Sequence, residues 1–195
     1  MITAVILAAG ESKRMGLSKP LLKIGDKTFV RNIVDIYKRS LVEDVIVVSQ
    51  PGEGDIEKEL GGTGVSIVPN PEYRKGQLSS IITGINVAEK SHADAVFIHP
   101  VDHPDINESV INKLVERYRR DMPLIVVPKY KGKRGHPVLF SNKLFEEIRT
   151  SPADVGARNV VWLHAEDTVE IETDYSGIIL DIDTPEDYEN LQRNM

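Results

Sequence analysis

Cationic side chains crowd a short stretch near the start of the chain. Lys13, Arg14 and Lys19 follow Ala8-Ala9-Gly10 within ten residues. Residues with almost no side chain let the backbone approach a bound group and expose its N–H donors. The apolar run just before them, residues 4–7, is typical of a strand buried on both faces. A buried strand that runs into a small, cationic loop predicts a polyphosphate site.

Two well-known phosphate loops are excluded by spacing. A Walker A loop needs four residues between its glycines and then Gly-Lys-Ser/Thr. Here five residues separate Gly10 from Gly16, and Leu17 follows. The dinucleotide fingerprint G-x-G-x-x-G fails as well, because Glu11-Ser12 follows Gly10.

Carboxylates stand where further strands are expected to end. Asp102 follows the apolar run 95–98, and Asp181 and Asp183 end the run 177–183, for which we expect a strand. Residues two apart on a strand point to one face, so both aspartates would face the same way. Carboxylates at the ends of buried strands are costly to bury, unless a cation compensates their charge. His99 and His103 flank Asp102, but a zinc site lacks a third soft ligand, and His99 is expected to be structural.

The elements that must position these residues alternate between strand and helix. Apolar runs at 44–48, 65–68 and 124–127 predict buried strands, and Thr28, Asn107 and Thr184 are expected helix caps. This alternation predicts a single doubly wound α/β domain over residues 1–195, with a mostly parallel sheet and helices on both faces. Residues 129–160 are expected to form a hairpin-like excursion.

Composition limits the class of function. The 195 residues carry a net charge of −6, which argues against broad nucleic-acid binding. The chain has no cysteine, so thiolate chemistry is excluded. No apolar run approaches the ~20 residues of a membrane span, and we expect a cytoplasmic protein with no membrane contact.

The loop and four later segments resemble one family. Leu7-Ala8-Ala9-Gly10-x-Ser12-x-Arg14-Met15-Gly16 with Lys19-Pro20 is similar to the signature loop of MobA-like NTP transferases, and within them to the molybdopterin cytidylyltransferase group. The likeness recurs at four places: Asn70-Pro71 with Gly76 to Ser80, the strand-end Asp102, Arg134-Gly135-His136-Pro137-Val138 with Gly156-Ala157-Arg158, and Asp181 to Asp187.

The resemblance implies a role for each matching residue. Arg14, Lys19 and Asp102 would be catalytic, and Asp102 with Asp183 would bind Mg²⁺. The acceptor would contact Arg134, His136 and Arg158. The nucleotide would contact Leu7, Ala8, Ala9, Gly10, Arg14, Lys19, Asn70, Gly76, Ser79 and Ser80.

The implied reaction transfers CMP from CTP to the terminal phosphate of molybdopterin and releases pyrophosphate. A transient contact with a molybdoenzyme is implied as well. Two alternatives of the same class stay open, namely GTP as donor and a sugar or isoprenoid phosphate as acceptor. A different class also stays open: a non-catalytic carrier that hands molybdenum cofactor to an apoenzyme.

Overall fold

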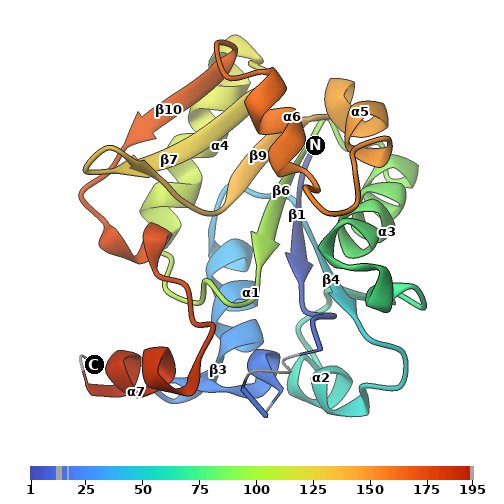
Figure 1. Cartoon of the computed structure of the whole chain (residues 1–195), viewed down its shortest axis with the longest axis vertical. Helices are drawn as coiled ribbons and strands as arrows, with labels where there is room; N and C mark the ends of the chain where they lie inside the picture. Colours follow the sequence, from blue (N-terminus) through green and yellow to red (C-terminus); the bar gives the residue numbers. More distant parts are fainter. Residues whose placement is uncertain (12–14, 17, 194–195) are drawn as a thin grey trace.

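The computed structural model describes residues 1–11, 15–16 and 18–193. Its centre is one mixed, mostly parallel sheet with the strand order β10-β7-β9-β6-β1-β4-β5, and β8 pairs with β7 outside this path (Figure 1). The strands of this sheet are β1 (Ile2–Leu7), β4 (Asp44–Ser49), β5 (Ser66–Pro69), β6 (Ala95–Pro100), β7 (Ile125–Tyr130), β8 (Lys133–Arg134), β9 (Val138–Ser141) and β10 (Thr168–Glu172). The α/β class with a mostly parallel sheet is confirmed.

The central strands are parallel and fully buried. Strand β1 pairs in parallel with β4 on one side and with β6 on the other. All six residues of β1 are buried, as the continuous apolar run predicts. Strand β9, from the expected excursion, inserts between β6 and β7 and runs antiparallel to both. Sequence patterning did not place this strand, because an apolar run does not reveal its partner.

Helices cover both faces of the sheet. One core contains side chains of α1, α2, α4 and α7, and a second core on the other face contains those of α3, α5 and α6. The helices are α1 (Phe29–Arg39), α2 (Gly54–Glu59), α3 (Gln77–Lys90), α4 (Glu108–Asp121), α5 (Phe145–Arg149), α6 (Arg158–Leu163) and α7 (Pro185–Arg193). Short 3₁₀ helices are η1 (Lys19–Leu21), η2 (Tyr73–Lys75), η3 (Asn142–Leu144) and η4 (Ser176–Ile179), and β2 (Lys23–Ile24) pairs with β3 (Lys27–Thr28).

The expected helix caps are confirmed. The Thr28 and Asn107 side chains accept hydrogen bonds from backbone N–H groups of the first turns of α1 and α4. At α7, the Thr184 hydroxyl accepts from the Asp187 N–H at 3.2 Å and the Asp187 carboxylate accepts from the Thr184 N–H at 2.8 Å. This reciprocal pair is a capping box.

The strand expected at 177–183 is absent, which is a correction. Residues 176–179 form η4, and 180–183 have no regular structure. The segment crosses the carboxyl end of the sheet instead, where the Ile182 N–H donates to the Asp102 carbonyl at 2.9 Å. The shared-face argument for Asp181 and Asp183 is therefore wrong. Both carboxylates still come to this end of the sheet, because the crossing segment carries them there.

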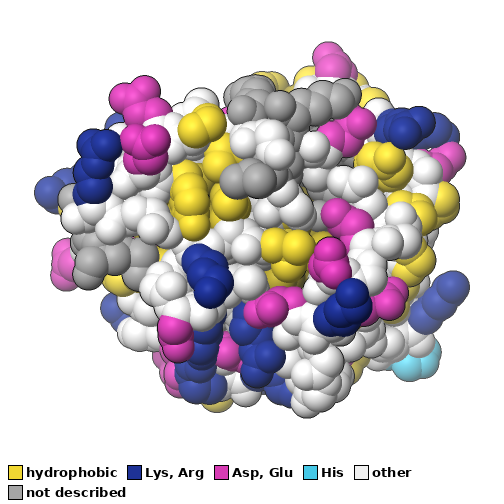
Figure 2. Space-filling model, turned by 90° about the horizontal axis from the view of Figure 1, so that it is seen from below, with side chains coloured by type: hydrophobic (Ala, Val, Ile, Leu, Met, Phe, Trp, Pro, Cys, Tyr) yellow, Lys and Arg dark blue, Asp and Glu magenta, His cyan; other side chains and the backbone are white. Residues whose placement is uncertain are grey.

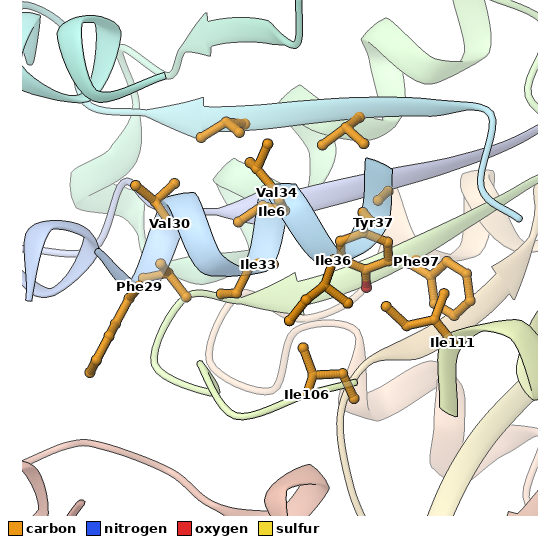
Figure 3. Packing of buried hydrophobic residues seen from close by; sticks show 14 of the residues in the cluster. Ile6, Phe29, Val30, Ile33, Val34, Ile36, Tyr37, Phe97, Ile106 and Ile111 are labelled. Carbon is orange, nitrogen blue, oxygen red and sulfur yellow. The ribbon is translucent and has the colours of Figure 1, made fainter. Parts of the chain in front are cut away.

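Helix α1 is the main anchor of the first core. Its side chains, among them Phe29, Ile33 and Tyr37, pack against Ile6 of β1 and Phe97 of β6 (Figure 3). These three helix side chains are fully buried, and each contributes about 1.5–3 kcal/mol of burial free energy. The helix is thereby fixed against the strands that end at the cleft described below.

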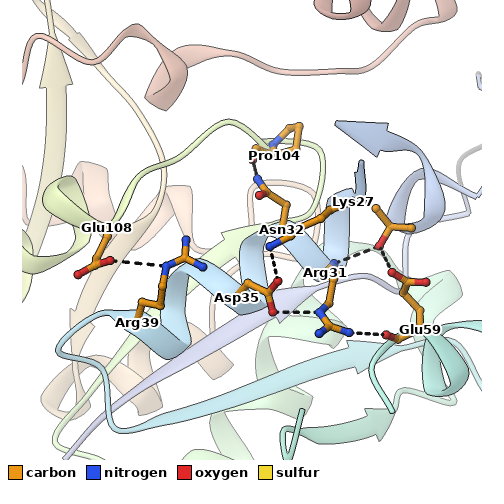
Figure 4. A network of polar contacts seen from close by, with 9 residues as sticks. Lys27, Arg31, Asn32, Asp35, Arg39, Glu59, Pro104 and Glu108 are labelled. Atoms are coloured by element: carbon orange, nitrogen blue, oxygen red, sulfur yellow. Dashed lines mark hydrogen bonds and ion pairs between the residues drawn. The ribbon is translucent and has the colours of Figure 1, made fainter. Parts of the chain in front are cut away.

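Helix α1 also holds the turn after β6. The Asn32 amide donates to the Pro104 carbonyl at 3.0 Å, and Arg31 and Lys27 both pair with Asp35 (Figure 4). The Thr28 cap is braced by a 2.9 Å hydrogen bond to Glu59. Asp102 belongs to the turn that Asn32 holds, so α1 is connected to the candidate site.

In the part of the chain that the structure describes, no helix combines the length and apolar character needed to cross a lipid bilayer.

Candidate functional site

A cleft of about 390 Å³ opens at the carboxyl ends of β1 and β6. Ligands of open α/β sheets bind at this end of the strands. Figure 2 looks onto this end of the molecule, where acidic and basic side chains surround exposed apolar ones. The residues lining the cleft are Leu7, Ala9, Gly10, Glu11, Lys19, Pro20, Tyr73, Arg74, Gly76, Gln77, Ser80, Pro100, Val101, Asp102 and Asp183.

Lys19 stands between two carboxylates in this cleft. Its Nζ lies 2.6 Å from Asp183 Oδ1 and 3.5 Å from Asp102 Oδ2. Its side chain is only 12% exposed, so water screens these charges less than on an open surface. The 3₁₀ turn η1 begins at Lys19 and continues through the buried Pro20, which fixes the backbone that carries the cation. The ammonium is therefore held where a phosphate can reach it.

The turn that carries Asp102 is set by buried hydrogen bonds. His99 Nε2 lies 2.9 Å from the His103 carbonyl, and His99 Nδ1 lies 3.0 Å from the Tyr37 hydroxyl. A carbonyl can only accept, so Nε2 is the protonated nitrogen and Nδ1 accepts from Tyr37. Complete burial lowers the pKa of His99 to about 3, which keeps the ring neutral. His99 is thus structural, as expected.

The amino end of α3 forms the opposite wall. Gly76 has a φ of +97°, a conformation that side chains rarely adopt, and it turns the chain from η2 into α3. Gly76, Gln77 and Ser80 line the cleft. Unpaired N–H groups in the first turn of a 14-residue helix attract anions. This wall therefore offers donors to a negatively charged ligand.

Asn70 and Ser79 do not line the cleft. The Asn70 amide donates to Ser79 Oγ at 2.9 Å and to Ser80 Oγ at 3.0 Å, and its oxygen accepts from the Glu72 N–H. Asn70 is only 1% exposed. Its hydrogen bonds fix the 70–80 loop and connect it to Ser80, which lines the cleft.

Two histidines and an aspartate extend the cluster beyond the cleft. The rings of His103 and His136 lie 4.3 Å apart, and Asp102, His103 and Asp181 bring ligand atoms within 4.8 Å of one another. Partial desolvation and the nearby Asp102 carboxylate raise the pKa of Asp181. Two carboxylates and an imidazole gathered in this way fit a divalent cation.

The three predicted acceptor residues are placed differently from one another. Burial, followed by the charges of His103, His99 and Arg158, lowers the pKa of His136 to about 3. Arg134 instead pairs with Glu170 of β10 at 2.8 Å. The structure therefore places His136 beside His103, the residue after Asp102, and ties Arg134 to the edge strand β10.

Gly135 and Gly177 make this convergence possible. A Cβ on Gly135 would lie 2.3 Å from the Ile178 carbonyl oxygen, and one on Gly177 would lie 2.3 Å from that of Asp105. No real side chain fits at these distances. Three segments from distant parts of the sequence, 102–105, 134–136 and 176–183, therefore interlock at the carboxyl end of β6.

The cleft unites many of the residues singled out from the sequence. Leu7, Ala9, Gly10, Gly76 and Ser80 line it together with Lys19, Asp102 and Asp183. Ala8 is fully buried, with its N–H bonded to Val48. Arg14 lies outside the described residues.

Sequence reasoning did not assign several cleft residues. Tyr73 and Arg74 lie on the wall, with the Arg74 guanidinium 5.5 Å from the centre of the Tyr73 ring. Gln77 is the first residue of α3, and Pro100 and Val101 stand at the end of β6. Their positions at a helix start and a strand end were the available signal, because these are where α/β folds bind ligands.

Comparisons with known proteins place the chain in the class of nucleotidyltransferases. The model of the MobA-like NTP transferase domain matches residues 4–168, so the chain belongs to this family. The resemblance seen in the loop is thereby confirmed.

Individual relatives are similar over long stretches. Molybdenum cofactor cytidylyltransferase of Escherichia coli (strain K12) is 27% identical, covering 96% of this chain and 93% of that one. A probable molybdenum cofactor guanylyltransferase of Thermococcus sibiricus (strain DSM 12597 / MM 739) is 30% identical, covering 74% and 71%. The structure of Rv0371C in complex with manganese, from Mycobacterium tuberculosis H37Rv, shares the fold at 22% identity, with a TM-score of 0.81 and coverage of 100% and 99%.

Proposed function

We propose that the protein transfers CMP from CTP to the terminal phosphate of molybdopterin and releases pyrophosphate. One observation carries the proposal: Lys19, Asp102 and the amino end of α3 converge on a single cleft at the carboxyl end of the sheet. The family supplies nucleotidyl transfer, and the similarity to the E. coli cytidylyltransferase supports CTP and molybdopterin.

The residues of the cleft divide the chemistry among them. An oxygen of the acceptor phosphate attacks the α-phosphorus of the nucleotide, and the bond to the β-phosphate oxygen breaks, so that pyrophosphate leaves with the electron pair. The second pKa of a phosphate monoester is ~6, so the nucleophile is mostly ionised at neutral pH and needs no strong base. Lys19 stabilises the charge that develops on pyrophosphate, and the N–H groups of α3 orient the nucleotide.

A divalent cation, Mg²⁺ by family resemblance, fits the acidic side of the cleft. Asp102 Oδ1 is buried and has no hydrogen-bond partner among the described residues, which is unusual for a carboxylate oxygen. Asp102 and one carboxylate of the 181–183 segment, Asp183 in the sequence prediction, would hold the cation. When bound, it neutralises phosphate charge. The manganese complex of Rv0371C supports a metal in this fold.

On the acceptor side, His136 would supply a neutral imidazole and Arg158 a cation. A phosphorylated pterin offers matching groups, namely a phosphate for the guanidinium and ring heteroatoms for hydrogen bonds. A transient contact with a molybdoenzyme would then deliver the product.

The test measures pyrophosphate release with Mg²⁺, molybdopterin and each of CTP, GTP, ATP and UTP, after a binding titration with the same four nucleotides. We expect CTP to bind most tightly and to give the fastest release. Faster release with GTP would make the protein a guanylyltransferase. Faster release with a sugar phosphate or an isoprenoid phosphate than with molybdopterin would identify that compound class as the acceptor. Binding of molybdopterin without release with any nucleotide would indicate a carrier and contradict the proposal.

A further inference from the structure

Buried polar atoms that lack a partner gather at one point of this molecule. Among the described residues, five buried side-chain nitrogen or oxygen atoms have no hydrogen-bond partner, and three of them are Asp102 Oδ1, His103 Nδ1 and His136 Nδ1. Nearly all buried polar atoms in folded proteins are paired, so three unpaired atoms at one place indicate a binding site for an ion or another ligand. The three residues are neighbours. The centres of the His103 and His136 rings lie 4.3 Å apart, and His103 is the residue after Asp102 in the sequence.

The spacing of the ligand atoms fits one cation. Atoms of Asp102, His103 and Asp181 lie within 4.8 Å of one another. Two ligands on opposite sides of a cation are roughly 4.4 Å apart when each bond is about 2.2 Å long. Small side-chain rotations therefore bring all three onto one ion. Lys19 already faces Asp102 Oδ2 at 3.5 Å, which leaves Oδ1 as the oxygen for the metal.

The backbone already holds these three residues in place. The His103 N–H donates to the Pro100 carbonyl at 3.1 Å, and the His103 carbonyl accepts from the buried His99 ring. The Ile182 N–H, next to Asp181, donates to the Asp102 carbonyl at 2.9 Å. Rigid backbones on both sides lower the entropy lost when the ion binds.

The imidazole decides which ion fits. Mg²⁺ is bound through oxygen atoms and water, whereas imidazole nitrogen favours divalent ions of the first transition row. We infer that Asp102, His103 and Asp181 form a site for such an ion, with Mn²⁺ as its probe, and that a ring nitrogen of His103 is a ligand. Asp183 is left as the carboxylate that pairs with Lys19. This assignment rests on the proposed function only for the use of the metal in nucleotidyl transfer.

The experiment loads the metal-free protein with Mn²⁺ in the absence of nucleotide. Calorimetry gives the affinities for Mn²⁺ and Mg²⁺, and electron spin-echo envelope modulation detects ¹⁴N of a coordinated imidazole. We expect a lower Kd for Mn²⁺ than for Mg²⁺ and a clear ¹⁴N signal. The variant His103→Gln should lose this signal and raise the Kd for Mn²⁺ by about tenfold or more.

Three further variants make the result specific. His92→Gln is the matched control, because His92 is exposed at the other end of β6 and should leave signal and affinity unchanged. Asp181→Asn should weaken Mn²⁺ binding and keep the ¹⁴N signal, which gives a second test if His103→Gln does not fold. Asp183→Asn should weaken Mn²⁺ binding less than Asp181→Asn.

Several outcomes would overturn the inference. Mn²⁺ bound without a ¹⁴N signal would mean a site of oxygen ligands alone. A signal that survives His103→Gln and disappears in His136→Gln would move the ligand to His136. Equal Kd values for Mg²⁺ and Mn²⁺ would contradict the predicted preference of the site for Mn²⁺. Because no nucleotide is present, failure of nucleotidyl transfer would leave all of these readings unaffected.

Discussion

Lys19 and Asp183 are 164 residues apart in sequence and form a 2.6 Å ion pair in the lining of the cleft. The pair joins the loop region after the first strand to the segment before the last helix. It keeps the ammonium extended in the cleft before any nucleotide is present. A triphosphate carries more negative charge than one carboxylate, so it can draw Lys19 away from Asp183 as it binds.

Removal of the Lys19 charge should slow nucleotidyl transfer. Lys19→Ala is expected to reduce kcat by roughly a hundredfold or more, because the ammonium stabilises charge on the leaving pyrophosphate. Pyrophosphate release measures the effect. Lys90→Ala at the distant end of α3 is the matched control and should leave the rate unchanged. Equal rates for both variants would exclude Lys19 from the mechanism.

Asp102→Asn should abolish metal-dependent turnover and spare metal-free nucleotide binding. A neutral amide is a much poorer ligand for a divalent cation than a carboxylate. Nucleotide affinity in the presence of EDTA and turnover at saturating metal separate the two effects. Full turnover in Asp102→Asn would place the metal elsewhere.

The acceptor side should respond in KM alone. His136→Ala and Arg158→Ala are expected to raise the KM for molybdopterin and to leave the affinity for CTP nearly unchanged, as for contacts made to one substrate. Arg134→Ala should have a small effect on both, because the Arg134 guanidinium is already paired with Glu170. Weakened CTP binding in the first two variants would refute their assignment to the acceptor.

Acid should destabilise the metal-free protein through His99. The pKa of His99 is about 3 in the folded protein and ~6.5 in an unfolded chain. Below pH ~6.5 the unfolded state therefore binds a proton at His99, whereas the folded state does not. This contribution to stability is complete above pH ~6.5 and is lost as the pH falls toward 3. The Tm, measured between about pH 7.5 and about pH 4.5, should fall less steeply with decreasing pH for His99→Gln than for the wild type. Parallel curves would show that His99 is not the group responsible.

Gly177→Ala should disturb the site through the backbone. The new Cβ would lie 2.3 Å from the Asp105 carbonyl oxygen and 2.5 Å from the Tyr175 ring, so the 176–183 segment must shift. We expect a loss of about 1–3 kcal/mol in unfolding free energy, together with slower turnover. Gly54→Ala is the control, since nothing lies within 4 Å of its added Cβ. A Tm equal to that of the control would contradict the interlocking of the segments.

The sequence by itself determined the parts of this protein that depend on local physics. Continuous apolar runs specified buried strands such as Ile2–Leu7, and side-chain oxygens at Thr28, Asn107 and Thr184 specified helix starts. The loop motif specified the family, because it depends on residue types at fixed spacing. Each of these signals lies within about ten residues of the structure it predicts.

Only the tertiary structure decided which distant residues meet. An apolar run does not reveal its partner, so the antiparallel insertion of β9 between β6 and β7 could not be read from its pattern. The residues around Ile178 resemble a strand, yet the carbonyl and N–H groups of 176–183 bond to the Asp102 and His136 turns instead. That packing, permitted by the missing side chain of Gly177, brings Asp181 to His103 and Asp183 to Lys19. Long-range backbone contacts determine these pairings, and local secondary-structure propensity does not predict such contacts.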